Sequence, residues 1–104
     1  GREKFDLVTA RAVAPLDALA ELASPLLADG GHLVAWKGEP EPEAEAAIAA
    51  NRDLLAMEIL RQETVVPFEG SRDRRLYVLR KTGPTPTGLP RRPGMARKRP
   101  LGGR

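Results

Sequence analysis

The first apolar run of the chain predicts a buried strand that leads into a helix. The run extends from Phe5 to Val8, and a helical pattern opens at Pro15, a residue that the first position of a helix accepts. Residues just past the carboxyl end of a strand line the ligand crevice of an open α/β sheet. Arg11 lies in this position, so we expect it at the mouth of a possible site.

The helical pattern after the first strand has one apolar stripe with spacings of three and four. Pro25 interrupts this stripe, so we expect a kink there or a short second helix capped by Ser24. The segment Asp29-Gly30-Gly31 is predicted to end the helix, because glycine accepts the left-handed conformation that terminates helices. The stripe consists of Leu16, Leu19, Ala20, Ala23, Leu26 and Leu27.

A second apolar run predicts the next strand, from His32 to Lys37. Near-continuous apolar runs are typical of parallel strands covered on both faces, so the chain from Phe5 to Lys37 is predicted to form one right-handed strand-helix-strand crossover. Within it we expect Trp36 in the core. Lys37 is interpreted as a solvated strand end, with a position facing the crevice as the alternative, and His32 as a polar residue at a strand start.

The second half of the body predicts a helix and a hairpin. Residues 39–43 are acidic, which favours a helix amino terminus, and a weakly apolar helical pattern runs from Glu43 to about Leu55 on the outside of the sheet. Met57 to Phe68 and Arg75 to Lys81 have strand patterns. Residues 69–73 between them are turn-forming, so we expect an antiparallel pair at this end of the sheet.

Charge divides the chain into an acidic body and a basic tail. Residues 1–79 hold 9 Lys or Arg and all 14 Asp or Glu, a net charge of −5, whereas residues 80–104 hold 8 Lys or Arg and no acid, a net charge of +8. Residues 82–104 also hold half of the ten prolines and half of the ten glycines without any period, which predicts an extended segment that orders where it docks. Such a tail favours a polyanionic partner. Packing on the acidic body is an equally open alternative.

Several classes of site are excluded by composition. The chain has no cysteine, and His32 is its single histidine, so neither a thiolate nor a histidine-based metal site can form. No Ser-His-Asp set and no glycine-rich phosphate loop is present, and the acids are expected on helix surfaces, which argues against a hydrolase. The chain has no apolar run of membrane-spanning length and does not open like a signal peptide. We therefore expect a cytoplasmic protein without metal.

Several short motifs are distributed along nearly the whole chain. They are Thr9-Ala10-Arg11-Ala12 after the first strand, Pro15-Leu16, Gly30-Gly31, Trp36-Lys37-Gly38, Pro90-Arg91-Arg92-Pro93-Gly94 and Lys98-Arg99-Pro100-Leu101. Together these motifs resemble those of the bacterial 16S ribosomal RNA guanine-N7 methyltransferases, also called the glucose-inhibited division protein B family. The resemblance covers only the second half of the family's domain, because no glycine-rich strand-to-helix turn precedes it.

The resemblance implies an α/β fold that forms the second half of a class I (Rossmann-like) S-adenosylmethionine-dependent methyltransferase sheet, ending in an antiparallel strand pair. Residues 1–81 are then the carboxyl-terminal half of the methyltransferase domain, and residues 82–104 are the basic tail. The first strand would lie beside the first strand of the missing half. In this chain alone it would be an unpaired apolar edge, which predicts poor solubility or association.

The implied activity is methyl transfer from S-adenosylmethionine to guanine N7 of 16S rRNA in the small ribosomal subunit, at guanine 527 in rRNA numbering. Guanine N7 has a lone pair and no proton, so its attack on a sulfonium methyl needs alignment rather than a general base. We therefore predict no catalytic acid or base in this chain, and the chain alone is expected to be inactive. The alternative is a non-catalytic rRNA-binding module that acts through its basic tail.

Arg11 is the one residue that the resemblance assigns to the S-adenosylmethionine site. A guanidinium at a strand end can form a two-pronged hydrogen bond to a carboxylate such as that of the cofactor's methionine part. In the alternative interpretation, Arg11 pairs with an acid of the missing half and only positions its loop. Thr9 and Ala10 are expected to shape the crevice.

The basic tail supplies the candidate RNA contacts. Each phosphate that the tail neutralises adds roughly 0.7 to 0.9 to the salt slope of binding. Leu89 stands where the family usually has an aromatic residue, and Ala96 where it often has proline. A tail that folds back onto its own domain is a nearly equal alternative. The candidates are Arg91, Arg92, Arg97, Lys98 and Arg99.

Overall fold

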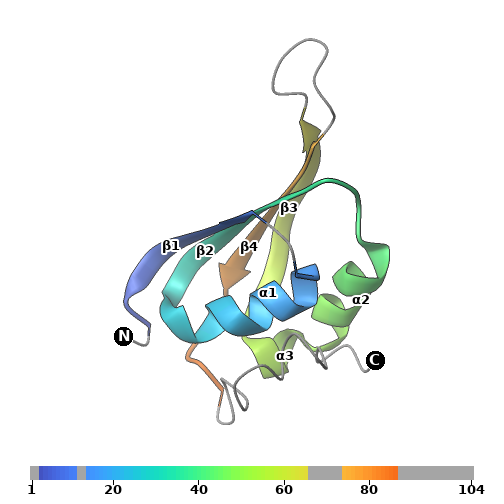
Figure 1. Ribbon diagram of the computed structural model, residues 1–104. Helices are drawn as coiled ribbons and strands as arrows, with labels where there is room; N and C mark the ends of the chain where they lie inside the picture. Colours follow the sequence, from blue (N-terminus) through green and yellow to red (C-terminus); the bar gives the residue numbers. More distant parts are fainter. Residues whose placement is uncertain (1–2, 12–13, 66–73, 87–104) are drawn as a thin grey trace.

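The computed structural model describes residues 3–11, 14–65 and 74–86. Within these ranges the chain forms a four-stranded sheet of β1 (Phe5–Arg11), β2 (Leu27–Lys37), β3 (Met57–Val65) and β4 (Arg74–Lys81), in the order β1-β2-β4-β3 (Figure 1). β1 and β2 are parallel, and β4 is antiparallel to both of its neighbours. The predicted crossover strands and the predicted antiparallel pair are thus confirmed.

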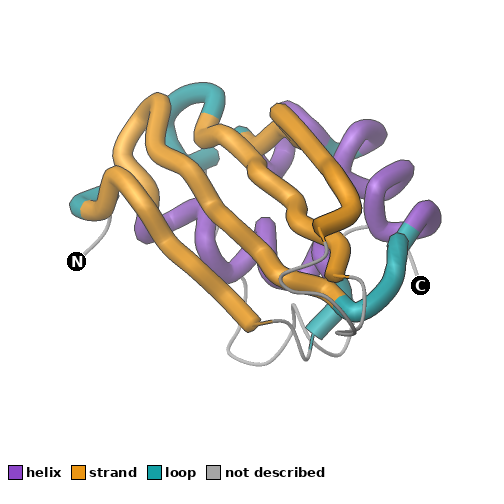
Figure 2. Tube along the Cα trace, turned by 90° about the horizontal axis from the view of Figure 1, so that it is seen from above, coloured by secondary structure: helices purple, strands orange, loops and turns teal. Residues whose placement is uncertain are grey.

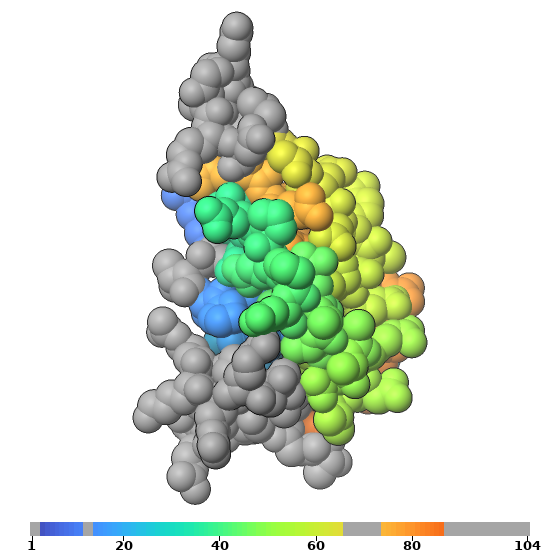
Figure 3. All heavy atoms as spheres, turned by 90° about the vertical axis from the view of Figure 1, so that its right-hand side faces the viewer, coloured from blue at the N-terminus to red at the C-terminus, as the bar shows by residue number. Residues whose placement is uncertain are grey.

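The helices all cover one face of this sheet, which Figures 1 and 2 show from two directions. They are α1 (Leu16–Ala23), α2 (Pro42–Ala50) and α3 (Arg52–Leu55). Alternate strand residues face the helices, and Leu33, Tyr77 and Leu79 form the centre of the core. Figure 3 shows α2, α3 and β3 lying next to one another on one side of the molecule.

The opposite face of the sheet carries no described helix. Trp36 points to this face and keeps 39% of its surface exposed, so the expectation that it lies in the core is wrong for the described chain. The reason is that successive side chains of a strand point to opposite faces, so Ala35 and Lys37 face the helices and Trp36 does not. The expectation that the acids lie on helix surfaces is also wrong for Asp17 and Glu21, which α1 buries.

The end of the first helix differs from the prediction. Pro15 is the N-cap of α1 instead of its first helical residue, and α1 ends at Ala23. A single turn of 3-10 helix, η1 (Ser24–Leu26), follows and is the expected short second helix. Ser24 does not cap it, because its hydroxyl donates instead to the carbonyl of Leu55 at 2.5 Å.

The two glycines after this turn do not end a helix, because they lie inside β2. The register between β1 and β2 shifts here, from Phe5 opposite Leu27 to Leu7 opposite His32. Gly30 has a φ of +79°, and a Cβ on Gly31 would come within 3.0 Å of the Phe5 carbonyl oxygen. The glycines are therefore needed for the irregular pairing of the two strands.

The single helix expected from Glu43 to about Leu55 is divided into α2 and α3 at Asn51, whose φ and ψ are −114° and 24°. Ala56 then ends α3 with a left-handed φ of +53°. The strand predicted from Met57 to Phe68 corresponds to β3, which the structure describes up to Val65. Residues 66–68 lie outside the described residues. The predicted turn over residues 69–73 lies outside the described residues.

Candidate functional site

Arg11 is the last residue of β1, whereas the sequence predicted it just past the end of the strand, and its side chain is exposed. It is directly opposite Trp36 in the parallel pairing, so both side chains are on the open face of the sheet, where the two strands end. Among the described residues, Arg11 has no ion-pair or hydrogen-bond partner. Its exposed guanidinium can therefore donate to an anionic group from outside this part of the chain.

Lys37 ends β2 beside this position, and the expectation that it is solvated is wrong. Only 5% of its surface is exposed. Its Nζ donates to the carbonyl oxygen of Ala14 at 2.6 Å and forms an ion pair with Glu41 at 2.5 Å. Lys37 therefore ties the end of β2 to the segment that connects Arg11 with α1.

Glu41 also contacts the segment between Arg11 and α1, at the first residue of the helix. Its second carboxylate oxygen accepts a hydrogen bond from the backbone N–H of Leu16, the first residue of α1, at 2.9 Å. The sequence pattern assigned the acids of residues 39–43 to the start of α2. That placement is confirmed, because Glu41 is the N-cap of α2 and Glu43 lies in its first turn. The side chain of Glu41 does not cap α2, however, and satisfies an amino-terminal N–H of α1, a long-range pairing that no local signal indicates.

Tyr77 links this arrangement to α2 and the sheet. Its hydroxyl accepts a hydrogen bond from the backbone N–H of Glu41 at 3.0 Å and donates to the carboxylate of Glu45. Burial and the hydrogen bond to Glu45 raise the pKa of Tyr77. The guanidinium of Arg75 lies 5.8 Å from the centre of its ring. We call the four side chains that hold this end of the sheet the carboxyl-end network: Lys37, Glu41, Glu45 and Tyr77.

The other predicted site residues, Arg91, Arg92, Arg97, Lys98 and Arg99, lie outside the described residues. The part of the chain that the structure describes contains no cluster of three or more potential metal ligands among histidine, cysteine and acidic residues. None of its helices is long and apolar enough to span a membrane. Arg11 is thus the one predicted site residue with a described position.

Comparison with known proteins agrees with the resemblance found in the sequence. A family model described as rRNA small subunit methyltransferase G matches residues 1–77. A protein of that name from Lacticaseibacillus paracasei is 43% identical over 102 residues, which are 98% of this chain and 42% of the relative. One from Pelotomaculum thermopropionicum is 47% identical over 104 residues, covering 96% of this chain and 42% of the relative.

The match extends over most of the body, including both parallel strands and the segment between them. The chain spans less than half the length of these curated relatives. From the extent of the family match and the identity with these relatives, the chain belongs to the rRNA small subunit methyltransferase G family.

Proposed function

We propose that this chain is the carboxyl-terminal half of an S-adenosylmethionine-dependent methyltransferase that modifies guanine N7 of 16S rRNA. The observation that carries the proposal is an exposed Arg11 at the end of a parallel strand in a chain of this family. The relatives are named as ribosomal RNA methyltransferases of the small subunit, and that activity is extended here to the present chain.

Arg11 is proposed to bind the cofactor's carboxylate. The fit rests on chemistry, since a guanidinium donates two parallel hydrogen bonds to a carboxylate, and Arg11 lacks an acidic partner among the described residues. When bound, the cofactor supplies a methyl group on a sulfonium. The contribution of this chain is to orient that group from the strand end.

The reaction places few demands on acids and bases in this chain. The N7 lone pair attacks without losing a proton, so alignment of the nucleophile, the methyl carbon and the sulfur provides the acceleration. The carboxyl-end network supports that alignment. It holds Ala14 and Leu16, which lie three and five residues after Arg11, through the Ala14 carbonyl and the Leu16 N–H.

The uncovered side of the sheet supports the assignment to half of a larger domain. β1 is an edge strand, and its Phe5 and Leu7 are 48% and 56% exposed. Trp36 on β2 and Leu60 on β3 are also exposed, at 39% and 50%. We propose that the remaining part of the protein covers this face and pairs with β1.

The concentration of positive charge in the tail favours a second candidate function. The six Lys or Arg of residues 82–104, without any acid, suit an RNA backbone even without catalysis. In this second candidate function the sheet supports a non-catalytic RNA-binding module. Its RNA affinity would then be independent of Arg11.

The test uses a protein in which this chain is joined to the part of the P. thermopropionicum relative that it does not cover, hereafter the completed protein. It is incubated with radiolabelled S-adenosylmethionine and small ribosomal subunits that lack the modification. Methylated guanine is located by chemical cleavage at N7-methylguanine. The Arg11→Ala variant is compared with Arg52→Ala, which removes an exposed arginine of α3.

The proposal predicts labelled N7-methylguanine in 16S rRNA with the completed protein and with Arg52→Ala, and at least about tenfold less with Arg11→Ala, a change of about 1.4 kcal/mol. A folded completed protein that binds rRNA without transferring a methyl group would contradict methyl transfer. That result would favour the RNA-binding module.

A further inference from the structure

Three arginines of the β3–β4 strand pair have no acidic partner among the described residues. Arg61 on β3 and Arg74 on β4 are exposed, and neither forms an ion pair or a side-chain hydrogen bond within the described ranges. Arg75 donates to uncharged groups, the Thr64 hydroxyl at 3.1 Å and the Gln62 side-chain oxygen at 2.7 Å. The charge of these three guanidinium groups is therefore not neutralised by an ion pair in this part of the chain.

Charge differs in sign between these two strands and the start of α2. β3 and β4 together hold five Lys or Arg and two Glu, a net charge of +3. Residues 39–45 hold four Glu and no Lys or Arg, a net charge of −4. A polyanion is therefore attracted to the strand pair and repelled by the start of the helix.

The two exposed arginines of the strand pair lie on the open face of the sheet. Tyr77 of β4 is buried against the helices, so its neighbours Leu76 and Val78 face the other way. Arg61 pairs with Val78, and paired residues share a face. Arg74 is two residues before Leu76 and therefore also points to the open face.

The same face carries Arg11, and the pairing of the strands gives the separations. Arg11 pairs with Trp36, which pairs with Leu76. Arg74 is therefore two strands across and two residues along the sheet from Arg11, a separation of about 12 Å between Cα atoms. Arg61 is three strands across and two residues along, about 16 Å from Arg11. One short RNA segment can span these distances.

The contact proposed above with the remaining part of the protein is compatible with this placement. Three of the four exposed apolar residues of the uncovered side, Phe5, Leu7 and Trp36, belong to β1 and β2. Arg61 and Arg74 belong to the two strands farther from the β1 edge. They therefore lie at the rim of that contact, where charged groups stay accessible to solvent.

We propose that Arg61 and Arg74 bind phosphate groups of the rRNA segment that presents its guanine beside Arg11. Arginine suits this task, because its guanidinium donates two parallel hydrogen bonds to a phosphate. Contacts to phosphate set the register of a nucleic acid and read no base. The identity of the RNA rests on the proposed function, whereas the unpaired arginines and their placement rest on the described contacts.

The first experiment compares three double variants of the completed protein. Arg61→Gln with Arg74→Gln removes the proposed phosphate contacts. Arg52→Gln with Arg80→Gln is the matched control, because it removes two exposed arginines that are bonded to Glu58. Arg61→Lys with Arg74→Lys retains the charge. For each protein, the affinity for 16S rRNA is measured at several salt concentrations, together with the affinity for S-adenosylmethionine.

The inference predicts a salt slope of rRNA binding that is smaller by roughly 1.4 to 1.8 in the variant with glutamine at positions 61 and 74, which is roughly 0.7 to 0.9 for each lost phosphate contact. The lysine variant and the control keep the slope of the unmodified protein, and the affinity for S-adenosylmethionine is unchanged in all three.

Two results would overturn the inference and leave the proposed function intact. One is an unchanged salt slope in the folded glutamine variant. The other is a parallel loss of S-adenosylmethionine affinity, because the arginines would then act on the domain rather than on the RNA. Failure of the unmodified completed protein to methylate 16S rRNA would instead overturn the proposed function, and its salt slopes would still test the phosphate contacts.

The second experiment tests the side from which the RNA approaches. Photo-crosslinking residues replace Glu63 on β3, which lies between the pairing positions of Arg61 and Arg74, and Ala46 on α2. Both positions are exposed. The inference predicts crosslinks to 16S rRNA from position 63 and at least about tenfold fewer from position 46, since phosphate is repelled by the acids at the start of α2. Crosslinks of equal strength from the two positions would overturn it.

Discussion

The two ends of the sheet are each held by a buried lysine that is the last residue of its strand. Lys37 ends β2 and Lys81 ends the antiparallel β4, so the two ammonium groups lie at opposite ends. Each donates to backbone carbonyls and faces a glutamate. The ion-pair partner Glu41 is four residues from Lys37, whereas Glu3, the partner of Lys81, comes from the other end of the described chain.

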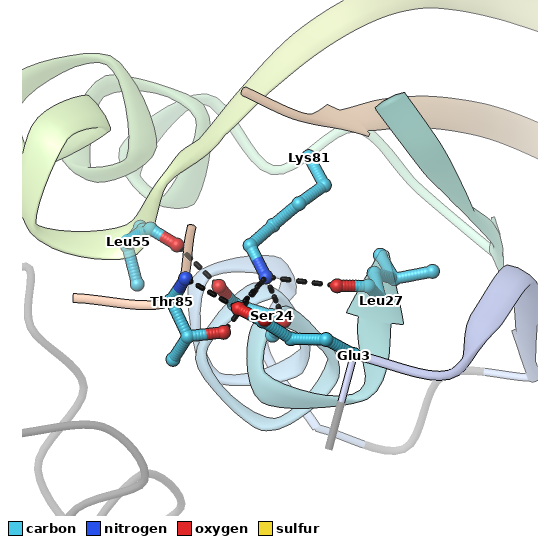
Figure 4. A network of polar contacts seen from close by, with 6 residues as sticks. All are labelled: Glu3, Ser24, Leu27, Leu55, Lys81 and Thr85. Atoms are coloured by element: carbon cyan, nitrogen blue, oxygen red, sulfur yellow. Dashed lines mark hydrogen bonds and ion pairs between the residues drawn. The ribbon is translucent and has the colours of Figure 1, made fainter. Parts of the chain in front are cut away.

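The two lysines therefore connect different parts of the chain. The carboxyl-end network holds the short connection after Arg11, and its glutamate is 27% exposed. Lys81 and its partners Glu3, Ser24, Leu27 and Thr85, the Lys81 cluster, join the first described residues to the end of the described chain, because Thr85 donates to Glu3, 82 positions away (Figure 4). Contacts between distant segments constrain the whole chain. We therefore expect the Lys81 end to dominate stability and the Lys37 end to dominate cofactor binding.

The largest expected effect is that of Lys81→Met on stability in the completed protein. It removes a buried ammonium that donates to the carbonyl oxygens of Ser24 and Leu27 and to the hydroxyl of Thr85, so the free energy of unfolding should fall by about 3 kcal/mol or more. Urea denaturation measures it. Arg80→Met is the control, because its exposed ion pair with Glu58 should contribute less than about 1 kcal/mol. Similar losses in the two variants would contradict a dominant Lys81 cluster.

The next effect sharpens the contrast between the two lysines. Lys37→Met should cost about 2 kcal/mol, less than Lys81→Met, because Glu41 is partly hydrated and keeps its bond from Leu16. The same variant should weaken S-adenosylmethionine binding, since the Ala14 carbonyl loses its donor beside the Arg11 connection. A larger loss of unfolding free energy in Lys37→Met than in Lys81→Met would contradict this prediction.

A smaller effect isolates the charge of Glu41 from its hydrogen bond. Glu41→Gln retains an oxygen that can accept from the Leu16 N–H but removes the ion pair with Lys37, so about 1 kcal/mol of unfolding free energy should be lost. Glu39→Gln, at an exposed acid in the same connection, is the matched control and should change stability by less than about 0.5 kcal/mol. Equal effects of both changes would show that net charge, rather than the Lys37 pair, is responsible.

The smallest effect concerns Tyr77 at alkaline pH. Its pKa is raised above 10.0 by burial and by Glu45, so its neutral form is favoured in the folded state. The associated stability is fully present below about pH 10 and is lost as the pH rises through the raised pKa. Tyrosinate absorbance of the completed protein, corrected by that of Tyr77→Phe, measures the shift. A midpoint at or below that of free tyrosine would contradict it.

The sequence predicts the parts of the fold that depend on local pattern. The apolar runs place β1, β2 and β4, although β1 continues three residues past its apolar run, to Arg11. It does not predict the division at Asn51. The glycines after η1 are misread, because their backbone freedom suits a helix end and an irregular strand pairing equally.

The buried lysines are missed for a different reason. A lysine at a strand end is normally solvated, and only its three-dimensional partners distinguish Lys37 and Lys81 from that norm. Trp36 is misassigned because an apolar run has the same appearance whether one face of its strand or both are covered. Long-range hydrogen bonds and the number of covered faces have no local sequence signal.

The most direct measurement is calorimetric titration of S-adenosylmethionine into the completed protein, with Arg11→Ala and the control Arg52→Ala. Arg11 at the cofactor site predicts binding that weakens at least about tenfold, or 1.4 kcal/mol, in Arg11→Ala and is unchanged in Arg52→Ala. Equal affinity of all three folded proteins would contradict the assignment of Arg11 to the cofactor.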